Sequence, residues 1–205
     1  MKVEELYRDD RLILRHVGSN RDFIEFLSKR AVDYSVHPLV DEFAEDEWNG
    51  KPESLFVFAQ KVIRYQKDPK WTEKVHAPMW YIKRIRAEKP VSGDCDDKTL
   101  FLATLLINRG YEVRLVGAHQ ITDRDKSEAD WKRINHVYLE FKEKSRIFDD
   151  EVWLPADPAS TSLRVREKSH KTIPLVRFHA DRGLDEVSDV QLETRSEVCR
   201  FQPSQ

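Results

Sequence analysis

Cysteine is scarce in this chain, since only two of its 205 residues are cysteines, Cys95 and Cys199. Two cysteines cannot build the disulfide framework on which small secreted domains depend, so the reducing cytoplasm is the expected location. A long apolar run is also missing, both in the first residues and in the rest of the sequence. We therefore expect neither a secretory signal peptide nor a membrane-spanning helix.

The chain has no marked excess of one charge, because 35 lysines and arginines stand against 37 aspartates and glutamates. Without a dense basic run, the sequence does not favour nucleic acid as a partner. Zinc-binding cysteine pairs and a His-Glu-x-x-His helix are absent as well. The acidic run that begins at Asp94 has Thr99 and Leu105 where a calcium-binding EF-hand needs Gly and Glu. We expect no metal and no other cofactor.

Cys95 lies at the start of a segment with strong helix signals. Asp94 is a good N-cap, and Asp97, three residues later, predicts an approximate capping box. Apolar side chains cover more than one face from 100 to 106, and Gly110 then supplies a stop signal. The pattern predicts a largely buried helix. A cysteine in its first turn meets the positive end of the helix dipole, which favours the thiolate.

Strands are expected after this helix. The segments 111–117 and 136–141 alternate apolar and polar side chains, as half-buried strands do. In the second segment, His136 shares the polar face with Tyr138 and Glu140. A third strand is expected from 146 to 154, and a proline-flanked Asp157 follows it. A hairpin of this length would place His136 and Asp157 on adjacent strands.

Cys95, His136 and Asp157 have the chemistry of a thiol nucleophile with its base and orienter. A nucleophilic cysteine needs a base within hydrogen-bond reach, and a third group must fix the tautomer of that base. Acyl transfer would then pass through a thioester, which water or an amine resolves. The rivals are weaker: His119 follows Gly117 in an expected turn, and Cys199 has no such neighbours.

Three short motifs carry a resemblance to a known family. They are Gly93-Asp94-Cys95, His136-Val137-Tyr138 and Trp153-Leu154-Pro155-Ala156-Asp157-Pro158. Their order resembles the transglutaminase-like superfamily of cysteine enzymes over roughly residues 53–160, and the Cys-Asp-Asp form is similar to bacterial and phage members. The resemblance implies an α+β, papain-like core in which helices pack on an antiparallel sheet. It also implies that Cys95 is the nucleophile, His136 the general base and acid, and Asp157 the orienter.

Two aspects of the site stay open at this level. The residues just before Cys95 lack the glutamine that serves papain-like proteases as an oxyanion donor. The Cys95 N–H could replace it in part, and Trp80, Tyr81 and Gln60 are candidates for the second donor or for substrate contacts. The carboxylates beside Cys95 raise its pKa and so oppose the helix dipole, and the sequence does not decide which effect is larger.

We expect three parts in the chain. Residues 1–52 form a helical and extended N-terminal extension with a helix at 21–33. Residues 53–180 form the catalytic core and begin with a helix at 54–66, and residues 181–205 form a charged tail. The predicted function is cysteine-dependent acyl transfer on an amide or peptide bond, as a peptidase, amidase or transamidase with a protein or peptide substrate. The alternative is a non-catalytic module, for example in a phage-related assembly.

Overall fold

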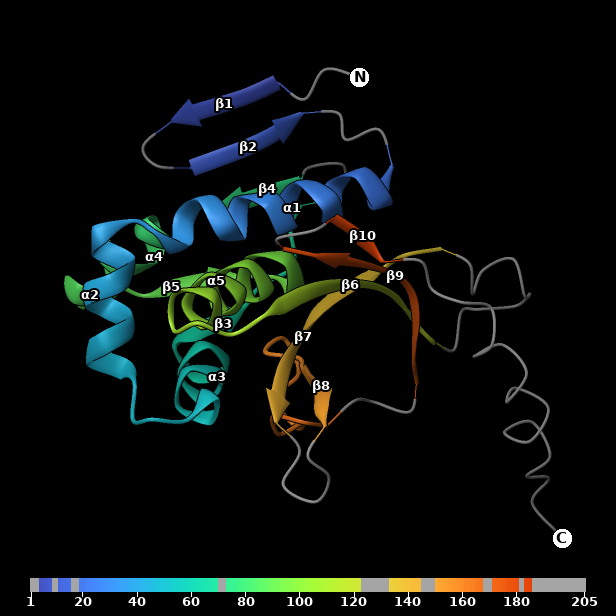
Figure 1. Ribbon diagram of the computed structural model, residues 1–205. Coiled ribbons are helices and arrows are strands. Elements are labelled where there is room, and N and C mark those ends of the chain that lie inside the picture. The colour runs from blue at the N-terminus through green and yellow to red at the C-terminus, as the bar shows by residue number, and fades with distance from the viewer. Residues whose placement is uncertain are drawn as a thin grey trace, which may run out of the picture.

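A five-stranded sheet and the helices beside it form the body of the protein (Figure 1). The computed structural model describes residues 4–8, 11–15, 19–69, 73–122, 133–144, 150–167, 171–180 and 183–185. The sheet has the order β10 (Gly183–Asp185), β9 (Thr172–His179), β6 (Val113–Gln120), β7 (His136–Lys144) and β8 (Glu151–Ala156). All its neighbouring strands are antiparallel. The predicted α+β class with an antiparallel sheet is therefore confirmed.

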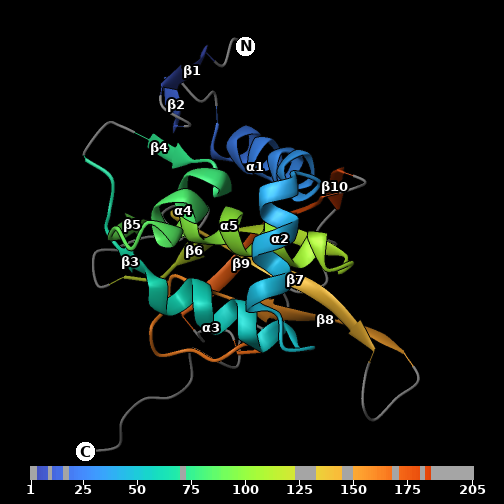
Figure 2. The same cartoon turned by 90° about the vertical axis from the view of Figure 1, so that its left-hand side faces the viewer.

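The helix α5 (Cys95–Asn108) lies between the sheet and the other helices (Figure 2). Its residues from 96 to 106 are all buried, because it packs against α1 on one side and β7 on the other. The helix ends as predicted: Gly110 has a φ of 85°, a left-handed conformation that glycine adopts without steric cost. Burial on all sides explains why its apolar residues follow no single stripe.

The other helices of the described chain surround α5. They are α1 (Asn20–Ser35), α2 (Pro38–Glu47), α3 (Pro52–Val62) and α4 (Pro78–Arg86). Three of them begin with proline, which is favoured there because the first helical N–H has no partner within the helix. Apolar side chains of α1 and α2 belong to the same core as those of α3 to α5. The boundary predicted at residue 52 therefore does not separate two cores.

Two small sheets complete the fold. The strands β1 (Glu4–Arg8), β2 (Arg11–Arg15) and β4 (Glu73–His76) form an antiparallel sheet. The strands β3 (Ile63–Tyr65) and β5 (Val91–Gly93) pair in parallel. The strand β5 leads directly into α5, so its pairing with β3 places residues 63–65 beside the start of that helix.

Several helices and strands begin or end at other residues than the sequence predicts. The helix expected at 54–66 ends at Val62, and the chain continues as β3. The strand expected from 146 begins at Glu151, while 145–149 lie outside the described residues. Pro155 lies inside β8, where it is tolerated because β8 is an edge strand. His119 belongs to β6 and not to a turn.

The faces of β7 follow the predicted parity, but both are buried. Val137, Leu139 and Phe141 join the main core beside α5. On the opposite face, Tyr138 packs with Val116 and Ala118, and the Glu140 carboxylate accepts hydrogen bonds from Arg114 (2.7 Å) and Arg177 (3.2 Å). The charged side chain on the polar face, Glu140, can therefore be buried because its charge is paired with two arginines.

Some predictions concern residues that the structure does not describe. Only β10 of the tail expected at 181–205 is among the described residues, and Cys199 is not among them. Within the described ranges, no helix is both long enough and apolar enough to cross a membrane.

Candidate active site

Cys95 is the first residue of α5, and Asp94 precedes it as the N-cap with an extended backbone. The predicted capping box is wrong. The Asp94 side chain makes no capping hydrogen bond, and the Asp97 N–H donates to Asp96 Oδ1 at 2.7 Å. The Asp97 carboxylate is held by His76 instead, whose backbone N–H donates to Oδ1 at 2.7 Å.

His136 and Asp157 meet across two adjacent strands. His136 is the first residue of β7, Asp157 follows the last residue of β8, and the two strands are antiparallel neighbours. The His136 Nε2–H donates to Asp157 Oδ2 at 2.8 Å, and both side chains are buried. The second carboxylate oxygen accepts the Ala159 N–H at 3.1 Å. Because Nε2 carries the proton, Nδ1 of a neutral His136 ring keeps a free lone pair.

A cavity of about 460 Å³ brings Cys95 and His136 together. It is bounded by the start of α1, the end of β3, the start of α5, the end of β6 and the residues that lead into β7. Its lining residues are Asn20, Phe23, Ile24, Tyr65, Lys67, Asp94, Cys95, Asp96, Gln120, Thr122, Arg133, Ile134, Asn135, His136 and Val137. Asp157 is not a lining residue and is joined to the cavity through His136.

The surroundings of Cys95 favour the protonated thiol. Burial raises the pKa of Cys95 well above its ordinary value, and the negative charges of Asp96 and Asp94 raise it further. A hydrogen bond from the Val137 backbone N–H lowers this pKa but does not outweigh the other effects. The sequence does not decide whether the helix dipole or the carboxylates have the larger effect on the pKa of Cys95. In the structure, the effects that raise this pKa are larger, so the helix dipole alone does not produce a resting thiolate.

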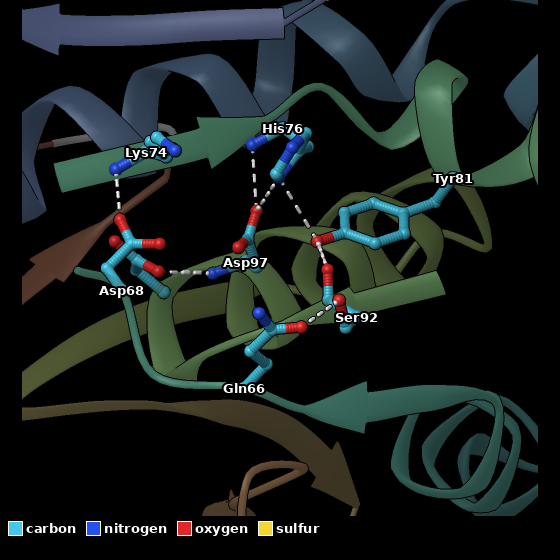
Figure 3. A network of polar contacts seen from close by, with 8 residues as sticks. Gln66, Asp68, Lys74, His76, Tyr81, Ser92 and Asp97 are labelled. Atoms are coloured by element: carbon cyan, nitrogen blue, oxygen red, sulfur yellow. Dashed lines mark hydrogen bonds and ion pairs between the residues drawn. The ribbon is translucent and has the colours of Figure 1, made fainter. Parts of the chain in front are cut away.

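A polar network lies behind the first turn of α5 (Figure 3). Residues two positions apart on a helix point in nearly opposite directions, about 200° apart, so Asp97 faces away from Cys95. His76 Nδ1 lies 3.1 Å from Asp97 Oδ1, and the Tyr81 hydroxyl donates to Ser92 O at 3.1 Å. Burial raises the pKa of Asp97, an effect that its contacts with His76 oppose. This network anchors the turn that carries Cys95.

Trp80, Tyr81 and Gln60, the side chains considered for the oxyanion or substrate, are not among the cavity's lining residues. Trp80 stacks on His76 with ring centroids 4.2 Å apart, and Tyr81 is fully buried in the network described above. Gln60 Nε2 donates to Ser160 O at 2.5 Å and to Leu163 O at 2.9 Å, so it ties α3 to the segment after Asp157. All three have structural partners away from Cys95.

Tyr65 and Lys67 line the cavity but were not identified from the sequence. The segment 54–66 reads as one helix, which hides the change to β3 at residue 63. An alternation of apolar and polar residues would have indicated the strand, but a strand of three residues is too short to show it.

Three carboxylates at the start of α5 form a compact acidic cluster. Asp94, Asp96 and Asp97 each offer an oxygen, and these oxygens lie within 4.8 Å of one another. In the described part of the chain, Asp94 Oδ1 and Asp97 Oδ2 are buried without a hydrogen-bond partner. Hard cations such as Ca²⁺ take carboxylate oxygens, so these residues have a donor set for a cation. The expectation of no metal was based on loop spacing, which does not detect such a cluster.

No protein-family model matches the sequence, and no curated protein matches it. Two solved structures are similar to it. A candidate protease from Parabacteroides distasonis has a TM-score of 0.48 and 11% identity, over 83% of this chain and 31% of that one. LapG from Legionella pneumophila has a TM-score of 0.43 and 15% identity, over 85% of this chain and 94% of that one. The chain thus spans less than a third of the first of these proteins, and its chemistry must be judged from its own residues.

Proposed function

We propose that the chain is a cysteine-dependent acyl-transfer enzyme that cleaves an amide or peptide bond through a thioester. The observation that carries this proposal is the 2.8 Å hydrogen bond from His136 Nε2 to Asp157 Oδ2, made by a histidine that shares a cavity with Cys95. This bond leaves Nδ1 as the basic nitrogen of the ring. A base with a fixed tautomer beside a thiol is the arrangement that nucleophilic catalysis requires.

The first half of the reaction begins from the neutral pair, because burial and the carboxylates of Asp96 and Asp94 hold the pKa of Cys95 above its ordinary value. His136 Nδ1 takes the proton from Sγ while Sγ attacks the carbonyl carbon, so the carbon–sulfur bond forms as the thiolate is generated. Asp157 stabilises the imidazolium that results. The imidazolium then protonates the leaving amine, the carbon–nitrogen bond breaks, and a thioester remains on Cys95.

The second half of the reaction decides the enzyme class. If water attacks the thioester with His136 as base, the protein is a peptidase or amidase. If an amine attacks, it is a transamidase. A cavity of about 460 Å³ falls in the range of sites for small molecules or a few residues of a peptide, so a protein or peptide segment is the substrate class that we propose.

The transglutaminase-like relationship is part of the same proposal. Cys95 at the start of a helix, His136 at the start of a strand and Asp157 after the next strand occur in the order that this family uses. The helix that carries the cysteine packs against the strand that carries the histidine. These placements support the resemblance that the sequence motifs suggest.

A non-catalytic module is the second candidate. The raised pKa of Cys95 favours it, because a buried thiol among carboxylates is a poor nucleophile unless a base removes its proton. Under this alternative, the bond between His136 and Asp157 would only stabilise the sheet.

Turnover of denatured casein, followed by mass spectrometry of the released peptides, separates the two candidates. Wild-type protein is expected to release peptides, Cys95→Ala to release none, and His136→Ala to act about 10²- to 10⁴-fold more slowly. Each variant is compared with wild type by circular dichroism to confirm its fold. Full peptide release by folded Cys95→Ala would refute the proposal.

A further inference from the structure

Tyr65 is held next to the segment that leads into Cys95. It is the last residue of β3, and its register partner in the parallel strand β5 is Gly93, two residues before Cys95. Immediately after Tyr65, the Gln66 N–H donates to Gly93 O at 2.9 Å, and the Ser92 hydroxyl donates to Gln66 Oε1 at 2.7 Å (Figure 3). The backbone that carries Tyr65 is therefore tied to the backbone that carries Cys95.

Tyr65 lies at the cavity and does not belong to the buried core. It lines the same cavity as Cys95 and His136, and the residue is 48% exposed. Two buried tyrosines differ in this respect: the Tyr81 hydroxyl donates to Ser92 O at 3.1 Å, and the Tyr138 hydroxyl donates to Glu140 at 3.4 Å. Within the described ranges, the Tyr65 hydroxyl has no hydrogen bond, so packing does not require it.

The Tyr65 hydroxyl keeps its proton at neutral pH. Burial raises its pKa to about 12, and the neighbouring Cys95 and Asp94 raise it in the same direction. Tyr65 is therefore a neutral hydrogen-bond donor at the cavity that Cys95 also lines.

An acyl-transfer site needs such a donor. When Sγ attacks a carbonyl carbon, the π electrons of the C=O bond move to oxygen, and donors must stabilise the negative charge that develops. The Cys95 N–H is one donor, since it is among the first N–H groups of α5 that the helix itself cannot satisfy. Asp94 and Asp96 would repel the oxyanion, so a single N–H would leave it poorly stabilised.

We propose that the Tyr65 hydroxyl is the second oxyanion donor of the site and acts together with the Cys95 N–H. This inference rests on the proposed acyl-transfer function and names a catalytic residue for it. As the C–S bond forms and the Sγ proton passes to His136 Nδ1, the Tyr65 O–H donates to the carbonyl oxygen. The bond strengthens as charge moves onto that oxygen, and it weakens when the C=O bond forms again and the leaving group departs.

The test compares two reactions of Cys95 that differ in whether an oxyanion forms. p-Nitrophenyl acetate acetylates a thiol through a tetrahedral oxyanion, with p-nitrophenolate as the leaving group. Iodoacetamide alkylates the same sulfur by displacement of iodide, without any oxyanion. Both modifications are measured on the Cys95 peptide by mass spectrometry, in wild type, Tyr65→Phe and Cys95→Ala. Tyr111→Phe is the matched control, because Tyr111 packs on Trp48 and Phe141 and does not line the cavity.

Tyr65→Phe is expected to slow acetylation at least about tenfold, since loss of one oxyanion donor costs about 10²- to 10³-fold in amide hydrolysis and an activated ester demands less. Alkylation should keep its wild-type rate, and Tyr111→Phe should change neither reaction. Acetylation at the wild-type rate in Tyr65→Phe would overturn the inference, and so would an equal fall in both reactions. Failure of the underlying function gives a different result: wild-type Cys95 would then remain unacetylated, or would be acetylated no faster than in folded His136→Ala.

Discussion

Asp157 Oδ2 accepts a hydrogen bond from His136 Nε2 at 2.8 Å, although 21 residues separate the two in sequence. The other oxygen of the same carboxylate accepts the Ala159 N–H at 3.1 Å. Asp157 is thus an acceptor on both sides, which only a carboxylate can be. This double role fixes which nitrogen of the His136 ring carries the proton.

Asp157→Asn is expected to lower turnover by about 10²- to 10⁴-fold, because an amide has one acceptor and one donor group. If its oxygen accepts the Ala159 N–H, its NH₂ faces His136 Nε2 and forces the proton onto Nδ1. Nδ1 then cannot accept the proton of Cys95. The measurement is casein turnover at pH 7, with thermal unfolding to check stability. Asp150→Asn, an exposed carboxylate before β8, is the control, and equal activity of both variants would contradict the orienting role.

Asp96→Asn is expected to speed the alkylation of Cys95 by iodoacetamide at neutral pH. Asp96 is the charge that contributes most to the raised pKa of Cys95, after burial. Its removal lowers that pKa and increases the thiolate fraction, while the amide oxygen can still accept the Asp97 N–H. The rate is measured from about pH 6 to about pH 10. Asp33→Asn, an exposed residue of α1, should leave the profile unchanged, and an unchanged profile in Asp96→Asn would be evidence against this electrostatic account.

Asp68 should make the stability of the fold depend on pH. Burial raises its pKa from 3.8 to about 6, so the folded state binds this proton more tightly than the unfolded state does. Its stabilising contribution is fully present below about pH 4 and is lost as the pH rises through about 6. Asp68→Asn keeps an acceptor for the Lys74 N–H but cannot ionise. The variant should therefore melt at a higher temperature than wild type at pH 8 and at a similar temperature at pH 4. A constant difference between the two proteins at both pH values would contradict this assignment.

Gly93→Ala should destabilise the fold by about 1–3 kcal/mol, the usual cost of overpacking. An added Cβ at this position would lie 2.6 Å from the Asp97 Cβ and would also collide with the Tyr81 hydroxyl. Either neighbour can move only if the network behind α5 breaks. Urea unfolding measures the loss. Gly50→Ala is the comparison, because its φ of 85° strains the backbone but its Cβ meets no atom within 4 Å. Full stability of Gly93→Ala would show that the turn before Cys95 is not tightly packed.

Local patterns predicted the elements that carry Cys95 and His136. The helix from Cys95 was visible because capping and stop residues flank a strongly apolar run. The alternation that begins at His136 gave the correct faces for Tyr138 on one side of β7 and for Val137, Leu139 and Phe141 on the other. Both signals arise within a few neighbouring residues, which is why the sequence alone is sufficient for them.

Contacts between distant segments could not be predicted in the same way. Asp97 looks like the partner of the helix cap, but His76 from β4 holds it. Tyr65 lies in a segment whose sequence has a helical pattern. It reaches the cavity because β3 pairs with β5, a contact between segments that are distant in the sequence. The three-residue length of these strands leaves no periodic signal.

The most direct test of the central claim is to look for an acyl group on Cys95 itself. After one addition of p-nitrophenyl acetate at pH 7, the reaction is quenched with acid at successive times, and the peptides are analysed by mass spectrometry. We predict that the acetyl thioester appears on Cys95 before it appears on Cys199, and that His136→Ala forms it on Cys95 about 10²-fold or more slowly. If Cys95 is acetylated as fast in folded His136→Ala as in wild type, or is never acetylated, then Cys95 and His136 do not form a catalytic pair.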